Sequence, residues 1–123
     1  MSNIMAVLFN GIAQLEYNRD TPLPDHQALY LDKMDAKMDQ GIIVGDKTIK
    51  NPDISQRAHF VAGNLAHALL QENETVAASM CTYLATRFPE LKQVKIDQAE
   101  DQLSIDLVFD EDYKGQVEVQ FMH

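Results

Sequence analysis

The chain has 123 residues, of which 46% are hydrophobic, and its 19 acidic and 10 basic side chains give a formal net charge of −9. This composition is too apolar for a disordered protein, and the length suits one domain over residues 1–123. The acidic balance disfavours direct binding to nucleic acid or anionic lipid, because both carry negative charge. Cys81 is the only cysteine, and the longest apolar run, residues 4–9, is too short for a membrane span. We therefore expect a cytoplasmic protein without a membrane partner.

The first segment, residues 2–17, fits two structures. Ser2 can cap a helix, and apolar residues recur at helical spacing along one face. These residues are Ile4, Leu8, Gly11, Ile12 and Leu15. The Asn-Gly pair at residues 10–11 lies between two apolar runs, however, and is typical of a hairpin turn. We expect the helix, with the hairpin as the alternative.

Two prolines make residues 18–24 a rigid connection. A helix is expected from Asp25 to Gln40, and Gly41 then supplies the left-handed residue that commonly ends a helix. Two short β-branched runs flank a Gly-Asp pair beyond it, which predicts a small hairpin near residues 42–49.

Two further helices are expected in the middle of the chain. The Asn-Pro-Asp triplet at residues 51–53 opens the first, because proline suits the first helical turn and either flanking side chain can cap it. Its apolar arc ends at Leu69, and Asn73 separates it from a helix over residues 74–88. Pro89 ends that helix, since the residue before a proline avoids helical angles.

Three runs near the C-terminus alternate apolar and polar residues, which is the pattern of strands with one buried face. Their apolar members are Val94 and Ile96, then Leu103, Ile105, Leu107 and Phe109, then Val117, Val119 and Phe121. The links between the runs are short, which predicts a three-stranded antiparallel meander. About four helices, counting the ambiguous first segment, would pack on this meander to form a two-layer α+β domain.

Phe60 is the first candidate for a binding residue. It falls outside the apolar arc of its helix, where its neighbours on the helical wheel are Arg57, Asn64 and His67. An aromatic side chain ringed by polar groups, with an arginine beside it, has the composition of a binding hot spot. The alternative is that the first segment covers Phe60 and makes it part of the core.

The C-terminal part of the chain concentrates the negative charge. Lys114 is the only basic residue after Ile96, and Asp110, Glu111 and Asp112 lie together in the expected link between the last two strands. The spacing is not that of an EF-hand loop. It fits a solvated sheet edge or a docking patch for a basic protein, and such carboxylates also permit an acidic mimic of nucleic acid that blocks a basic protein.

Asp32, Asp35 and Asp39 lie on one ridge of the second expected helix, at i, i+3 and i+7. Carboxylate oxygens that converge can hold a hard cation, although a single ridge spreads them along the axis and needs ligands from elsewhere. The three aspartates are therefore candidate metal ligands, with a solvated helix face as the simpler interpretation.

Arg19 and Asp20 come directly before the proline-rich connection. A rigid loop that carries an arginine can present a site. We favour the alternative, in which both side chains only brace the turn.

The remaining patterns point away from catalysis. The histidines form no i, i+4 pair, Cys81 has no base on its own helix, and no glycine-rich phosphate loop occurs. We predict a small acidic protein-binding or regulatory accessory module without cofactor or catalysis of its own. Its expected partner is another protein, either a basic one or a second copy of this chain. The alternatives are a metal-binding protein or enzyme that uses the aspartate ridge, and the nucleic-acid mimic.

Overall fold

The computed structural model describes residues 3–44 and 46–111, which fold into three helices, a four-stranded sheet and a two-stranded hairpin. In chain order the elements are β1 (Ile4–Phe9), β2 (Ile12–Asn18), α1 (Asp25–Asp39), β3 (Ile42–Val44), β4 (Lys47–Ile49), α2 (Ile54–Leu70), α3 (Glu74–Arg87), β5 (Gln93–Ala99) and β6 (Gln102–Val108). The fold is α+β, but the prediction of four helices on a three-stranded meander is wrong.

The N-terminal segment is a β-hairpin and not the expected helix. β1 and β2 pair antiparallel, with Met5 opposite Tyr17. Asn10 and Gly11 form the turn with positive φ values of 52° and 82°, which asparagine and glycine adopt more readily than other residues. The helical spacing of apolar residues was misleading because the middle of β1 is buried on both faces, so the strand shows no alternation.

The sheet has the order β2-β1-β5-β6. β5 and β6 pair antiparallel, with Ile96 opposite Ile105, as the sequence predicts. The other neighbour of β5 is β1, which runs parallel to it with Val7 beside Val94. The predicted meander is therefore wrong, because the N-terminal hairpin completes a mixed sheet. The predicted third strand of the meander, over residues 117–121, lies outside the described residues.

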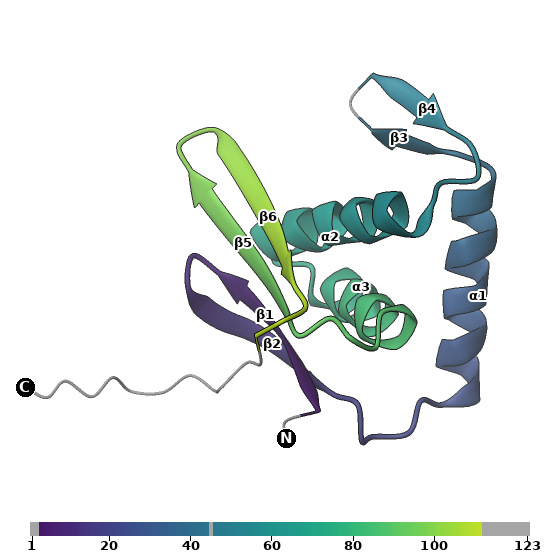
Figure 1. The fold of residues 1–123 in the computed structure, drawn as a ribbon, viewed down its shortest axis with the longest axis horizontal. Coiled ribbons are helices and arrows are strands. Elements are labelled where there is room, and N and C mark those ends of the chain that lie inside the picture. Colours follow the sequence, from purple (N-terminus) through teal and green to yellow (C-terminus); the bar gives the residue numbers. More distant parts are fainter. Residues whose placement is uncertain (1–2, 45, 112–123) are drawn as a thin grey trace, which may run out of the picture.

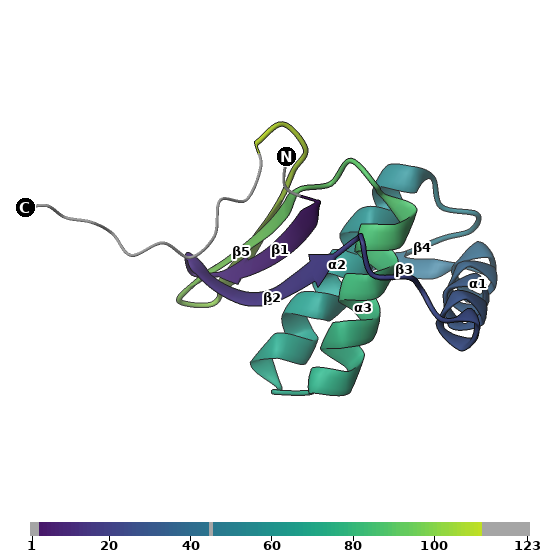
Figure 2. The same cartoon turned by 90° about the horizontal axis from the view of Figure 1, so that it is seen from below.

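Helices α2 and α3 lie side by side against one face of the sheet (Figure 2). Both confirm the helices expected from the sequence, and Asp53 and Gln56 form a reciprocal capping box at the start of α2. Residues with at most 1% exposure fill the interface between helices and sheet: Met5, Val7, Val61, Leu65, Leu84, Val94 and Ile96. We call β1, β2, α2, α3, β5 and β6 the body.

The helix α1 and the hairpin β3–β4 form a separate arm on the far side of α2 and α3 from the sheet (Figure 1). In α1 only Leu31 and Met38 are buried. Gly41 links the two parts of the arm with a φ of 138°, and a Cβ placed there would lie 3.3 Å from Cγ2 of Thr48. Glycine is thus needed where the helix turns into the hairpin, as the sequence predicts. The antiparallel pairing of β3 with β4 confirms the expected hairpin.

Candidate functional site

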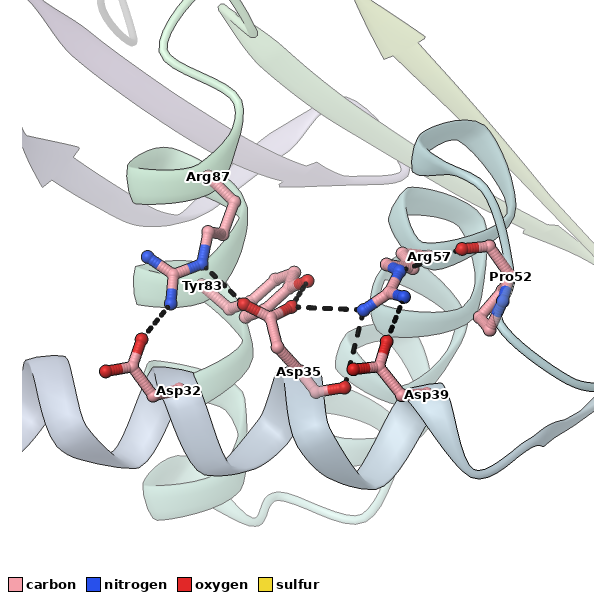
Figure 3. A network of polar contacts seen from close by, with 7 residues as sticks. All are labelled: Asp32, Asp35, Asp39, Pro52, Arg57, Tyr83 and Arg87. Atoms are coloured by element: carbon pink, nitrogen blue, oxygen red, sulfur yellow. Dashed lines mark hydrogen bonds and ion pairs between the residues drawn. The ribbon is translucent and has the colours of Figure 1, made fainter.

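The arm meets the body through a polar network centred on Asp35 (Figure 3). The Asp35 carboxylate accepts hydrogen bonds from the Tyr83 hydroxyl and, at 2.8 Å, from Nε of Arg87. Nη2 of Arg87 also donates to Oδ1 of Asp32 at 2.8 Å. Burial and the hydrogen bond to Asp35 both raise the pKa of Tyr83 above its ordinary value, so the phenol stays a neutral donor.

Arg57 continues the same network at the other end of α1 (Figure 3). Its Nε donates to the carbonyl oxygen of Pro52 at 2.9 Å, and its Nη2 pairs with the Asp39 carboxylate. Nη1 lies 3.4 Å from the backbone carbonyl oxygen of Asp35. The hydrogen bond to Asp39 raises the pKa of Arg57. Arg57 therefore points into the network, although the sequence groups it with Phe60.

The three aspartates of the ridge bind arginines of the same chain. Asp32, Asp35 and Asp39 face the two arginines of α2 and α3, so their carboxylates are neutralised by guanidinium groups. Across residues 3–44 and 46–111, no three His, Cys, Asp or Glu side chains are grouped so that they could hold a metal ion. In this geometry the three aspartates position α1 against the body.

Phe60 lies on the opposite flank of this junction. Its side chain is half-buried and packs against the core, and the arm covers part of it rather than the N-terminal segment. Beside Phe60 runs a hollow of about 370 Å³ between α1, β3 and α2. The apolar side chains that line it include Tyr30, Met34, Met38, Ile42, Phe60 and Met80.

Two further hollows continue this one. A hollow of about 490 Å³ under the β3–β4 hairpin shares Phe60 and Asn64 with it, and His67 lines its wall. A hollow of about 340 Å³ between α1 and α3 shares Tyr30 with it. Neighbouring hollows share lining residues along the arm, and we call the three hollows together the groove. The structure thus brings Phe60, Asn64 and His67 together, as the sequence predicts.

The acidic C-terminal residues lie elsewhere. Asp110 and Glu111 follow β6 on the sheet side of the molecule, and both are exposed. The backbone carbonyl oxygen of Glu111 accepts a hydrogen bond from Nε2 of Gln93 at 2.8 Å, and its carboxylate lies 3.9 Å from Nζ of Lys95. Asp112 lies outside the described residues. The side chains of Asp110 and Glu111 do not line the groove.

Arg19 acts over a longer distance than the sequence suggests. Its guanidinium donates to the carbonyl oxygens of Ala85, Phe88 and Leu91 at 3.0, 3.0 and 2.6 Å, so it caps the C-terminal end of α3. Burial lowers the pKa of Arg19. Arg19 therefore does more than brace its own turn, as the sequence interpretation had it, because it holds the end of α3. No sequence signal links Arg19 to that helix.

The groove itself was missed because its residues resemble core residues. Tyr30, Met34 and Met38 form an apolar stripe on α1, and such stripes usually pack inside a protein. In the structure Tyr30 stays 47% exposed and Met34 is half-buried. The only signal in the sequence is the high share of methionine in this stripe, since methionine serves in adaptable binding surfaces as well as in cores.

Comparisons with protein-family models, curated protein sequences and solved structures found no match for this chain. No helix in the described part of the chain combines the length and apolar character needed to cross a membrane.

Proposed function

We propose that this chain is a cytoplasmic protein-binding module without catalysis of its own, and that an apolar segment of another protein binds in the groove. The observation that carries this proposal is the half-buried Phe60, which lines the same hollow as Met34 of α1 and Met80 of α3. Aromatic residues in pockets supply much of the energy of protein interfaces, and the flexible methionine side chain adapts to different partners.

The shape of the groove favours a protein segment over a small molecule. A small ligand is usually enclosed in one cavity that covers most of its surface. Here three hollows of about 340, 370 and 490 Å³ follow one another and open to solvent. An amphipathic helix fits such a track, because its apolar residues recur at i, i+3 or i+4, and i+7 along one side.

A peptide-display selection on the intact protein tests this proposal. The probe is a random library of peptides about 16 residues long, enough for roughly four helical turns. We expect enriched peptides that Phe60→Ala binds about tenfold more weakly or worse, as truncation of a hot-spot residue does. Ile54→Ala is the matched control, because Ile54 is also an apolar residue of α2 but is 72% exposed and does not line the groove.

Two outcomes would count against the proposal: no peptide is enriched, or the enriched peptides bind Phe60→Ala as well as the unchanged protein. Light scattering across a range of protein concentrations measures the oligomeric state and so tests whether a second copy of the chain occupies the groove. A dimer that Phe60→Ala dissociates and Ile54→Ala preserves would mean that a second copy of the chain binds in the groove.

A further inference from the structure

We infer that the segment bound by the groove is acidic, with carboxylates beside its apolar residues, although the chain itself has a net charge of −9. This inference rests on the proposed function and names the chemistry of the partner. It runs against the expectation from composition alone, which favours a basic partner.

The walls of the groove contain no carboxylate. Within the described part of the chain, no Asp or Glu lines any of the three hollows, although the whole sequence has 19 acidic residues. Lys37 is the one lining residue with a formal charge at neutral pH, and the other polar lining groups include His26, Asn64 and His67. A lysine or arginine of a partner would therefore meet Lys37 here without any acidic group to receive it.

The cause lies in how α1 divides its charges between two flanks. Its three ridge aspartates are turned to one flank, where Arg57 and Arg87 bind them. Lys33 and Lys37 are exposed and lie one turn apart on the other flank, next to Tyr30 and Met34. The network thus turns three of the four acidic side chains of α1 away from the groove, while Asp25 stays exposed in the first turn of the helix, next to His26. The basic side chains Lys33 and Lys37 remain beside the groove.

The hairpin extends this basic surface. Lys47 and Lys50 are exposed on and after β4, where Ile49 lines the third hollow. In the described part of the chain, the exposed acidic residues from Asp97 onward lie in β5 and β6 or in the segments that directly follow these strands: Asp97, Glu100, Asp101, Asp106, Asp110 and Glu111. Because the Debye length is only about 8 Å at physiological ionic strength, the negative charge of the sheet is largely screened at the groove. The exposed acidic residues near its ends, Asp25, Asp46 and Asp53, do not line any of the three hollows.

The peptide selection described above also tests this inference when it is repeated on two charge variants. On the unchanged protein we expect enriched peptides with an excess of Asp and Glu. Lys37→Glu should bind those peptides about tenfold more weakly, and selection on it should enrich neutral or basic peptides. Lys95→Glu is the matched control, because it changes the net charge equally but lies on β5 in the sheet.

The outcomes separate this inference from the proposed function. Enriched peptides that depend on Phe60 but are neutral or basic overturn the inference and leave the proposed function standing. An equal loss of affinity in Lys37→Glu and Lys95→Glu also overturns it, because only net charge would then matter. Peptides that bind regardless of Phe60, or a failure to enrich any peptide, overturn both.

Discussion

The body and the arm lie against each other in the same small chain, yet different contacts hold them. In the body, side chains of α2, α3 and the sheet such as Leu65, Leu84 and Ile96 are completely buried. In the arm, α1 buries Leu31 and Met38 and packs the half-buried Met34 against the core, and its carboxylates bind arginines of the body. The hollows of the groove follow this second, more polar junction.

This difference shows how a small fold can keep an apolar groove open. Apolar burial is non-directional, so a junction built from it closes up until few voids remain. Hydrogen-bonded ion pairs are directional and fix α1 at the distance that two arginine side chains span. The body therefore supplies stability, and the network sets the position of the arm that forms one wall of the groove.

Two leucine truncations test this division most strongly. Leu84 in α3 and Leu31 in α1 are both buried, at 0% and 1% exposure. Leu84→Ala should lower the free energy of unfolding by about 2–5 kcal/mol, because it leaves a cavity in the body. Leu31→Ala should lower the free energy of global unfolding by less than Leu84→Ala does. It should instead speed amide hydrogen exchange in residues 25–49. Denaturant unfolding and amide exchange measure the two effects, and equal losses would show that arm and body unfold as one unit.

Substitutions in the network should have a smaller effect. Asp35→Ala removes the carboxylate that accepts hydrogen bonds from Arg57, Tyr83 and Arg87. We expect it to lower the free energy of unfolding, or the free energy of opening the arm, by about 1–3 kcal/mol. Asp32→Ala is the matched control, because Asp32 is 70% exposed and binds only Arg87, and its loss should stay below about 0.5 kcal/mol. Denaturant melts of both variants give the comparison, and similar losses would argue against a central role for Asp35.

Alkaline pH should affect both regions through two buried acids, one in the body and one at the junction. Burial raises the pKa of Cys81 in the body to about 12, and burial with the Asp35 hydrogen bond raises that of Tyr83 at the junction. Both groups stay neutral when folded, whereas the unfolded chain releases their protons near pH 9 and 10. Stability should therefore be unaffected below about pH 9 and fall as the pH rises further.

Unfolding midpoints measured between pH 7 and 11 test this dependence. Cys81→Ala and Tyr83→Phe should each flatten the fall in stability, and a profile that neither variant changes would contradict the assignment. A thiol reagent gives a second check at pH 8, where buried Cys81 should react only as fast as the chain opens.

The sequence predicts best those elements whose signals are local. The three helices follow from caps, prolines and Gly41, and the β3–β4 hairpin follows from the Gly-Asp pair between two β-branched runs. All of these signals act within a few residues. The N-terminal hairpin was missed although its Asn-Gly turn was noticed, because β1 is buried on both sides and resembles a helix in its apolar spacing. Parallel pairing of β1 with β5 joins distant parts of the chain and leaves no local mark.

The same contrast between local signals and contacts across the chain applies to the candidate site. Phe60, Asn64 and His67 share one helix face, so helical periodicity is enough to group them. Arg57 was grouped with them, but it turns to the aspartate ridge of α1, a contact between separate elements. The basic character of the groove also depends on that contact, since it decides which charges of α1 remain beside the groove. Composition alone therefore suggests the opposite partner.

The place of β1 in the sheet has a consequence for how the protein is made. β1 is synthesised before the other elements of this fold, yet its parallel neighbour β5 is synthesised only after the three helices α1, α2 and α3. Until then the nascent chain carries an apolar strand with one unpaired edge, the kind of surface that chaperones recognise and that associates with other chains. A chain that stalls after α3 should be aggregation-prone even though its helices are complete, so the domain must complete its sheet late in synthesis or after release.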